Sequence, residues 1–357
     1  MQQKQSYCVA VLGATGAVGR RMIDTLERKD FPVGELRLLA SPRSAGSTLT
    51  FRGQPVRVEA ASEEGFRGVD IALFSAGASA SRDFAPLAVQ QGAVVIDNSS
   101  AFRLEADVPL VVPEVNPEDA FRHKGIIANP NCSTIQLVVA VKPLLDLGLE
   151  RLTVTTYQAV SGMGQKAIDA LMEEVALGPN ETKKTLFPVH GQETTYPMAF
   201  NVLPQCDVFV EDGYTREEMK LVNESRKILG LPGLRVSPTA VRVPVLYGHA
   251  EAVELQFSRP VTPEEVRQRL AHAKGVVLVD DPAGNVFPHP RMAAGTGETY
   301  VGRIRRGLAD DRSILMFVVA DNLLKGAAWN AVQIAELLVG LDPNRQPKDG
   351  HVEALLA

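Results

Sequence analysis

Short apolar runs alternate with amphipathic stretches over the first third of the chain. Four runs are expected to be strands, at residues 7–12, 35–40, 69–74 and 93–97. The stretches that follow the first and third runs, and that end near Lys29 and Gln90, have the periodicity of helices. This alternation predicts a parallel, doubly wound sheet that extends to about Pro130.

A different pattern begins after residue 130. Residues 133–145 are apolar at helical spacing, and the strands that follow alternate apolar and polar side chains. Strands are expected at residues 151–160, 234–245, 249–258, 300–305 and 313–320, the second and third of them adjacent. Such alternation suits a sheet with one covered face, so a large mixed or antiparallel sheet is predicted.

Helices and one long loop complete this second part. Residues 215–229 are amphipathic with Thr215 as N-cap, and residues 262–274 form another helix. Residues 179–204 have weak periodicity and many polar side chains, so we expect a surface excursion and a candidate subunit contact. A final helix at 327–340 has an alanine-rich face and is expected to return to the first domain.

Composition and charge fit a globular protein of two domains. The 357 residues are 45% hydrophobic and 22% charged, which is enough for a large core. We expect the first domain at 1–131 and 323–357 and the second at 132–322. The net charge of -5, without a dense lysine or arginine tract, argues against nucleic acid or an anionic membrane as partner. Small molecules are therefore the expected partners.

The cysteines and the first apolar run indicate the compartment. Cys8, Cys132 and Cys206 are too few and too widely spaced for a disulfide framework or a structural metal site. The first apolar run is far too short for a signal sequence or a membrane span. The sequence therefore predicts a protein of the reducing cytoplasm without a metal.

A glycine loop joins the first strand to the first helix. Its glycines are three residues apart, whereas the commonest NAD fingerprint reads Gly-x-Gly-x-x-Gly. Glycines let the backbone approach a pyrophosphate, and the following helix N-terminus offers N–H donors and a favourable dipole. Tight-turn chemistry alone explains many such triplets, but this position favours a nucleotide. The loop residues expected to bind it are Gly13, Thr15, Gly16, Ala17 and Val18.

The loop after the second strand indicates which nucleotide binds. A site specific for NAD would place an acidic residue there for the ribose 2'-hydroxyl, and this loop has none. Ser41, Arg43 and Ser44 instead offer a guanidinium and hydroxyls that suit a 2'-phosphate. We therefore expect NADP, against the alternative of a solvated basic loop.

Small and polar residues follow the next two strands. Ser75, Ala76 and Gly77 leave room for a ligand at the carboxyl edge of the sheet. Arg103 follows the fourth strand at the same edge, where it could hold a phosphate or form a surface ion pair.

Cys132 lies where a short apolar strand meets the helix at 133–145. Unpaired N–H groups and the positive end of the helix dipole favour an anion there, so the thiol is expected to ionise more readily than a free one. This position favours a nucleophile, and the alternative is a cysteine that only packs in a turn.

Further candidates lie later in the chain. Arg242 and His249 lie between two expected strands, which places both near one sheet edge, although a strand histidine is more often structural. Glu217 and Lys220 are three residues apart on one helical face, which by itself is a common ion pair.

Taken together, these residues resemble the aspartate-semialdehyde dehydrogenase family. The similarity lies in six motifs that span the chain almost end to end, at residues 13–19, 75–79, 129–134, 158–162, 242–249 and 321–323. The glycine loop is shared with many dehydrogenases, but the cysteine motif combined with the arginine and histidine is specific. The resemblance implies NADPH-dependent reductive dephosphorylation of L-4-aspartyl phosphate to L-aspartate 4-semialdehyde and phosphate, on the route to lysine, methionine and threonine.

The resemblance also implies an architecture and a set of catalytic residues. It implies an α/β fold: a Rossmann-type NADP-binding domain, and an α+β catalytic and dimerisation domain of a homodimer. Cys132 would attack the acyl phosphate to form a thioester, and Gln158 would orient that acyl group. His249 would be an acid/base that titrates near neutrality.

Substrate and cofactor contacts follow from the same resemblance. Arg242 would bind the substrate α-carboxylate, and Glu217 its α-ammonium. Lys220 and Arg103 would hold the phosphate. The spacing to Lys220 favours Glu217 over Glu218. Further cofactor contacts are implied for Ser161, Gly162 and Asn322.

Two alternatives remain open at this point. N-acetyl-glutamyl-phosphate reductase has the same architecture, but its cysteine motif usually reads Gly-Cys-Tyr-Pro, where this chain has Asn131, Cys132, Ser133 and Thr134. A non-catalytic NADP-binding paralogue would be expected to have lost the nucleophile or the base, and this chain keeps both.

Overall fold

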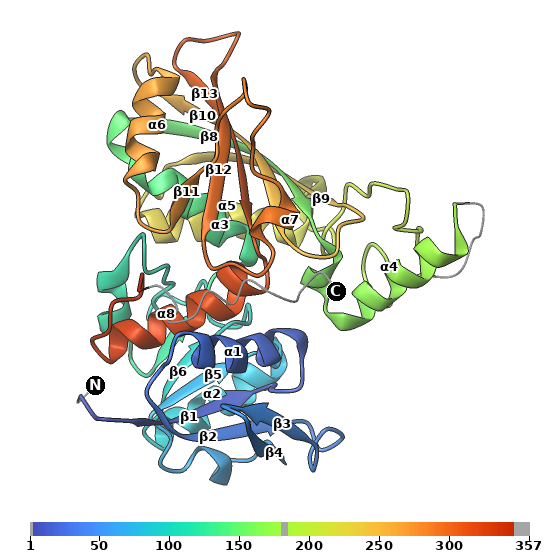
Figure 1. Ribbon diagram of the computed structural model, residues 1–357, viewed down its shortest axis with the longest axis vertical. Coiled ribbons are helices and arrows are strands. Elements are labelled where there is room, and N and C mark those ends of the chain that lie inside the picture. Colours follow the sequence, from blue (N-terminus) through green and yellow to red (C-terminus); the bar gives the residue numbers. More distant parts are fainter. Residues whose placement is uncertain (1–2, 180–184, 346–357) are drawn as a thin grey trace. The chain divides into compact units, whose positions relative to one another are not determined.

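The computed structural model describes residues 3–179 and 185–345, which form two compact units (Figure 1). The first unit comprises residues up to Asn131 and those from Ala327 onward, and the second comprises the residues between them. No helix among the described residues is both long enough and apolar enough to cross a bilayer.

The chain re-enters the first unit at Ala327, whereas it was expected to return there at residue 323. Asp321 explains the difference, because it holds the turn that follows it to the second unit. Its backbone carbonyl accepts a hydrogen bond from the Gly326 N–H at 2.9 Å. Its carboxylate accepts bonds from the N–H groups of Leu323 at 2.8 Å and Leu324 at 3.1 Å.

A seven-stranded sheet in the order β3-β4-β2-β1-β5-β6-β7 forms the first unit. All its pairs are parallel except β3 with β4. Its strands are β1 (Tyr7–Leu12), β2 (Val33–Ala40), β3 (Thr48–Phe51), β4 (Gln54–Ala60), β5 (Ile71–Phe74), β6 (Val94–Asp97) and β7 (Ile126–Ala128). Its helices are α1 (Ala17–Arg28), α2 (Ala78–Gln90) and α8 (Trp329–Leu338), with 3₁₀ turns at Glu64–Phe66 and Pro117–Arg122.

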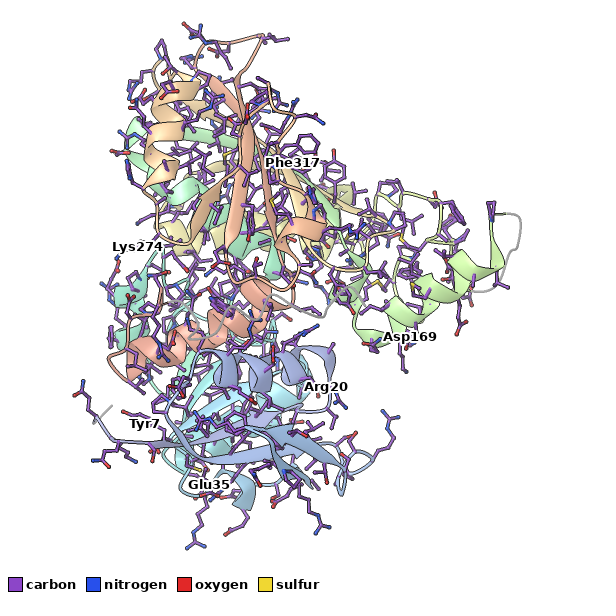
Figure 2. The ribbon with its side chains drawn as sticks, viewed as in Figure 1. Tyr7, Arg20, Glu35, Asp169, Lys274 and Phe317 are labelled. Atoms are coloured by element: carbon purple, nitrogen blue, oxygen red, sulfur yellow. The ribbon has the colours of Figure 1, made fainter. Side chains whose placement is uncertain are left out.

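Helices cover both faces of this sheet, as the doubly wound prediction requires. α1 and α8 lie on one face (Figure 1), where Met22 and Ile334 pack into a hydrophobic cluster. Ala85 and Ala88 of α2 pack into the cluster on the other face. Side chains of the first helix, such as the labelled Arg20, are drawn in Figure 2.

The sequence pattern did not predict the hairpin of β3 and β4. Its strands bury few side chains, among them Phe51 and Val58, so they lack the apolar run of the neighbouring strands. Arg52 and Gly53 form its turn with φ of 49° and 73°. Two successive positive φ values are typical of a two-residue hairpin turn, but Arg-Gly is not one of its usual sequence signals.

A buried ion pair fastens α8 to α1. Lys29 Nζ lies 3.1 Å from Glu336 Oε2, and both side chains are fully buried. The Lys29 ammonium also lies 4.5 Å from the centroid of the Trp329 ring, at the start of α8. Burial lowers the pKa of Lys29, and Glu336 opposes that shift. Removing Glu336 would leave the Lys29 ammonium buried without its carboxylate partner.

We therefore expect Glu336→Leu to lower the free energy of unfolding by about 3 kcal/mol. The double variant Glu336→Leu with Lys29→Met should recover most of that loss, because the fully buried ammonium is also removed. The other partner of Glu336, Arg345 at 2.7 Å, is partly exposed. Urea denaturation followed by fluorescence of the single tryptophan, Trp329, measures both. A single variant as stable as the wild type would show that the pair does not fasten the helix.

The second unit is built on a six-stranded sheet in the order β11-β12-β13-β10-β8-β9. The expected large mixed sheet is confirmed. Its strands are β8 (Leu149–Gln158), β9 (Arg235–Arg242), β10 (His249–Phe257), β11 (Val276–Leu278), β12 (Thr299–Arg306) and β13 (Ser313–Ala320). Its helices are α3 (Cys132–Val141), α4 (Gln165–Leu177), α5 (Arg216–Leu229), α6 (Pro263–Ala271) and α7 (Pro290–Ala293). Shorter turns lie at Lys142–Leu147, Val160–Met163 and Glu211–Gly213, and a π-helical turn at Leu324–Ala328 leads into α8.

The expectation that β9 and β10 are adjacent is wrong. β8 lies between them, parallel to β9 and antiparallel to β10. The connecting segment does not turn back as a hairpin, because the carbonyls of Val245 and Leu246 accept hydrogen bonds from the N–H groups of Val160 and Ser161. Consequently the carboxyl ends of β8 and β9 meet the amino end of β10 at one edge of the sheet.

The predicted surface excursion at 179–204 is only partly a surface feature. Residues 180–184 lie outside the described residues. Of the rest, Phe187 and Met198 are fully buried in a cluster with Ile168 of α4. Tyr196 and Phe200 are 51% and 62% exposed. The segment therefore packs on α4 and still presents apolar side chains to solvent.

Candidate active site

Cys132 is the first residue of α3, as the sequence predicted. Every later residue of this helix is buried, whereas Cys132 is partly exposed and forms no disulfide. Gly326 packs directly against it, since a Cβ atom at this glycine would lie 2.7 Å from the Cys132 Cβ. The helix is thus held rigidly by apolar packing, and its first side chain is accessible.

Three polar side chains form a row at the sheet edge described above. Gln158 ends β8, Arg242 ends β9 as its register partner, and His249 begins β10. Ala250 pairs with Tyr157, which places His249 beside Gln158 in this row. All three side chains are buried, with exposures of 5% or less. We call them the catalytic row.

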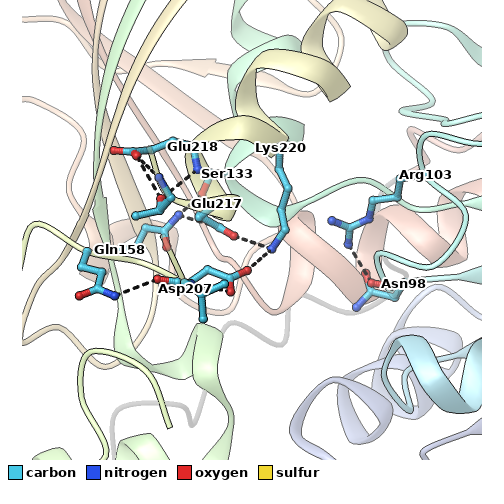
Figure 3. A network of polar contacts seen from close by, with 11 residues as sticks. Asn98, Arg103, Ser133, Gln158, Asp207, Glu217, Glu218 and Lys220 are labelled. Carbon is cyan, nitrogen blue, oxygen red and sulfur yellow. Dashed lines mark hydrogen bonds and ion pairs between the residues drawn. The ribbon is translucent and has the colours of Figure 1, made fainter. Parts of the chain in front are cut away.

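Gln158 connects the catalytic row to α3, the helix that Cys132 begins, and to α5. Its amide nitrogen donates to the hydroxyl of Ser133 at 2.5 Å and to Glu217 Oε1 at 3.0 Å (Figure 3). Because Ser133 directly follows Cys132, the first turn of α3 lies at the end of β8.

Glu217 and Glu218 have different environments. Glu218 belongs to a capping box, in which its Oε2 accepts from the Thr215 N–H at 2.6 Å. Its Oε1 accepts from the Ala240 N–H at 2.9 Å, so both carboxylate oxygens of Glu218 accept hydrogen bonds from backbone N–H groups. Glu217 instead faces Gln158 and Lys220. The structure therefore favours Glu217 as the acidic residue of the site, in agreement with the spacing argument.

Lys220 lies between two carboxylates. Its Nζ is 2.8 Å from Glu217 Oε2 and 3.0 Å from Asp207 Oδ2 (Figure 3). Burial alone would lower the pKa of Lys220, but the two carboxylates raise it, so its charge is secure at neutral pH. Sequence analysis missed Asp207, which precedes α5 in a segment without periodicity. Its φ of 66°, a conformation in which aspartate is enriched, is not readable from one sequence.

His249 is neutral and its tautomer is fixed. Its Nδ1 accepts a hydrogen bond from the Ala159 N–H at 3.0 Å, so the ring proton lies on Nε2. Burial, and next the positive charge of Arg242, lower the pKa of His249 to about 3. The expected titration near neutrality is therefore wrong for this site. Nε2 is buried without a partner among the described residues.

Arg242 is a buried cation without a carboxylate partner in the described part of the chain. One terminal nitrogen donates to the Ala159 carbonyl at 2.9 Å, and its Nε is buried and unpaired. Gly162 keeps space in front of it, because a Cβ there would lie 3.2 Å from Arg242 Nη1 and 3.4 Å from His249 Nε2. A buried guanidinium is costly unless it meets an anion, so the site suits an anionic substrate.

Ser161 and Asn322 brace the same end of the sheet. The Asn322 amide nitrogen lies 2.9 Å from Ser161 Oγ, and its oxygen accepts from the Gly248 N–H at 2.9 Å. Both residues thus fix the backbone that leads into His249. Their cofactor contacts stay a prediction.

The glycine loop of the first unit has the features that a pyrophosphate requires. Gly13 has a φ of 82°, and a Cβ there would lie 2.6 Å from the Ser75 carbonyl oxygen. α1 begins at Ala17. Its N-cap, Gly16, makes no side-chain cap, so the N–H groups at Ala17 and Val18 are not satisfied by a capping side chain.

The loop after β2 lies beside this glycine loop, since the Leu39 carbonyl accepts a bond from the Gly13 N–H at 2.8 Å. Ser44 N–H donates to the Ser41 carbonyl at 2.9 Å, and Arg43 between them is exposed. The arrangement fits a 2'-phosphate. Ala76 and Gly77 follow β5, and Gly77, with a φ of 85°, has open space at its Cβ position.

Arg103 is buried in the first unit, with an exposure of 7%, so it is not a surface side chain. Its Nε donates to the Asn129 carbonyl at 3.0 Å and its Nη2 to the Asn98 carbonyl at 2.9 Å (Figure 3). Backbone carbonyls therefore orient this guanidinium.

Comparison with known proteins agrees with both units. Residues 8–123 match the semialdehyde dehydrogenase NAD binding domain, and residues 141–325 match the semialdehyde dehydrogenase dimerisation domain. The aspartate-semialdehyde dehydrogenase of Aquifex aeolicus is 53% identical over 340 residues, which cover 93% of this chain and 98% of that protein. The chain belongs to the aspartate-semialdehyde dehydrogenase family. The Bacillus subtilis member is 50% identical over 338 residues, with coverages of 94% and 98%.

Solved structures of the family share the fold. Aspartate semialdehyde dehydrogenase II from Vibrio cholerae, complexed with ASA, superposes with a TM-score of 0.88 at 49% identity and covers 94% of this chain and 99% of its own. The Candida albicans enzyme with NADP has a TM-score of 0.70 at 28% identity, with coverages of 93% and 98%.

The family assignment makes the protein an oxidoreductase whose first domain binds a nicotinamide dinucleotide. The second unit is a dimerisation domain, which supports a homodimer. The exposed apolar side chains of Tyr196, Phe200 and Val202 suit a subunit contact.

Proposed function

We propose that the protein catalyses NADPH-dependent reductive dephosphorylation of L-4-aspartyl phosphate to L-aspartate 4-semialdehyde and phosphate through a thioester on Cys132. The reaction would run in the cytoplasm, on the route to lysine, methionine and threonine. The observation that carries the proposal is the catalytic row. In it a buried Arg242, without a carboxylate partner among the described residues, and a neutral His249 lie beside Gln158, which is bonded to the first turn of α3.

The first step is acyl transfer to sulfur. The Cys132 thiolate attacks the carbonyl carbon of the acyl phosphate, a C–S bond forms, and the C–O bond to phosphate breaks with departure of inorganic phosphate. Lys220 and Arg103 hold the phosphate oxygens and stabilise the departing charge. Lys220 is suited to this role because its two carboxylate neighbours keep it protonated.

The second step is reduction of the thioester. A nicotinamide cofactor held by the first unit would supply the hydride for the thioester carbon. His249 donates a hydrogen bond from its Nε2–H to the carbonyl oxygen, on which negative charge develops. Gln158 orients that carbonyl, and the intermediate collapses to the aldehyde as the Cys132 thiolate leaves.

Two charged side chains of the site, Arg242 and Glu217, would recognise the substrate. Arg242 presents a planar fork to the α-carboxylate, and Glu217 accepts the α-ammonium. An N-acylated substrate would have no cation for Glu217, which argues against N-acetyl-glutamyl phosphate.

The first unit would hold the cofactor. The N–H groups at the start of α1 and the loop from Gly13 to Val18 suit the pyrophosphate. Arg43, with Ser41 and Ser44, suits the 2'-phosphate of NADP. Ser75, Ala76 and Gly77, and Ser161, Gly162 and Asn322 from the second unit, are proposed as further contacts.

The direct test follows NADPH absorbance in the reverse direction. Mixing the protein with NADP, phosphate and aspartate semialdehyde should give phosphate-dependent NADPH formation. N-acetyl-glutamate semialdehyde should give none. Activity with the acetylated aldehyde alone would support the rival reductase, and binding of NADP without either activity would support a non-catalytic paralogue.

A substitution in the 2'-phosphate loop tests the cofactor. Arg43→Ala is expected to raise the Michaelis constant for NADP about tenfold or more, because a charge-assisted contact is lost, and to leave any rate with NAD unchanged. Arg122→Ala removes another exposed arginine of the first unit and serves as the control. Equal losses with NADP and NAD would contradict the assignment.

A further inference from the structure

Behind the catalytic row the second unit buries a carboxyl group that the proposed chemistry does not use. Glu251 on β10 is fully buried, and neither carboxyl oxygen makes a hydrogen bond of standard geometry to another described residue. Burial raises the pKa of Glu251 well above its usual range, and the neighbouring amide of Gln136 on α3 opposes that shift. Both side chains are thus buried polar groups with each other as neighbour.

Glu251 occupies the row next to the catalytic row. It lies two residues after His249, and successive side chains of a strand alternate between faces, so both face the same side of the sheet. Its register partner on β8 is Thr156, two residues before Gln158. Gln136 follows Cys132 by four residues, which places the two on one face of α3.

The two spacings match. Four helical residues advance about 6 Å, and two strand residues advance about 7 Å. The Ser133 to Gln158 bond places the first turn of α3 at the end of the sheet where the catalytic row lies. Gln136 therefore lies about as far along α3 from Cys132 as Glu251 lies along β10 from His249.

We propose that Gln136 and Glu251 are positioning residues that fix how far along β10 the helix α3 presents Cys132 to His249. A protonated carboxyl and a primary amide can exchange two hydrogen bonds, one in each direction. Beyond Thr134 every other side chain of α3 is apolar, and apolar contacts are non-directional. A shift of α3 along β10 would separate the Gln136 amide from the Glu251 carboxyl and leave both buried polar groups without a partner. The pair therefore fixes the position of α3 along β10.

The test rests on the proposed function and uses the full-length enzyme. Gln136→Met keeps the length of the side chain and removes its polar atoms. We expect it to lower kcat by between about tenfold and a hundredfold, the range expected for a displacement near 1 Å. The Michaelis constants for aspartate semialdehyde and NADP should stay within about twofold, because their binding groups are untouched. Glu251→Met should behave in the same way.

Rescue by a conservative variant separates positioning from packing. Glu251→Gln replaces the acid by an amide that can still pair with Gln136, so kcat should stay within about threefold of the wild type. Leu255→Ala, farther along β10, should lower the melting temperature without lowering kcat. Should Glu251→Met fail to fold, kcat of Gln136→Met, which loses the polar pair, can still be compared with kcat of Glu251→Gln, which keeps it.

Two results would overturn the proposal. The first is a folded Gln136→Met with wild-type kcat, and the second is a Glu251→Gln as impaired as Glu251→Met. An inactive wild type with aspartate semialdehyde would instead refute the proposed function, so the two failures are distinguishable.

Discussion

Cys132→Ser is expected to lower turnover by about ten thousandfold or more while NADP still binds with its normal affinity. A serine hydroxyl is scarcely ionised near neutral pH, so it cannot replace a thiolate as the nucleophile that forms the acyl intermediate. Removal of a nucleophile from an enzyme that acts through a covalent intermediate typically causes a loss of this order or larger. Steady-state rates with aspartate semialdehyde and a fluorescence titration with NADP measure the two quantities.

Cys8→Ser is the matched control for this variant. Cys8 lies on β1 of the first unit, and burial raises the pKa of its thiol to about 11. It has no role in the proposed reaction, so turnover should stay within about twofold of the wild type. Turnover of Cys132→Ser within tenfold of the wild type would contradict covalent catalysis.

Arg242→Lys is expected to lower kcat/KM for aspartate semialdehyde about a hundredfold, with most of the loss in KM. Lysine keeps the charge, but it cannot make two parallel hydrogen bonds to the substrate carboxylate. Its ammonium must also be buried where the guanidinium now donates to the Ala159 carbonyl. Initial rates over a range of substrate concentrations give kcat and KM separately.

Arg235→Lys is the control on the same strand, because this side chain lies at the opposite end of β9 and is 64% exposed. It should leave kcat/KM unchanged. An Arg242→Lys variant with normal KM would show that another group binds the substrate carboxylate.

Local patterns predicted much of the fold. The continuous apolar run Tyr7–Leu12 became β1 with its predicted bounds, and Thr215 caps α5 as its position before an acidic first turn indicated. Cys132 begins α3 for the same kind of reason, since a turn with Pro130 precedes an apolar helical pattern. These features depend on neighbours in sequence, which a single chain displays.

Features that depend on distant partners were not predictable. The insertion of β8 between β9 and β10 depends on which strands pair. The alternation of apolar and polar residues along a strand does not indicate its neighbour. The sequence placed Arg242 and His249 at one edge, but the row with Gln158 exists only because of that insertion.

The same limit applies to charge. The sequence around a histidine in a strand reveals neither how deeply the ring is buried nor which N–H group donates to its Nδ1. The low pKa of His249 could therefore be inferred only from the tertiary structure. Asp207 was missed because its contact with Lys220 joins a loop to a helix.

The central claim is that the substrate becomes bonded to one sulfur atom, and acid-quenched mass spectrometry tests it directly. The protein would be mixed with NADP and aspartate semialdehyde in buffer without phosphate, so that oxidation of the aldehyde proceeds but release of the acyl group does not. We predict a rapid formation of about one NADPH per subunit, together with an aspartyl group on the peptide that contains Cys132. Rapid NADPH formation with that peptide unmodified would contradict the account.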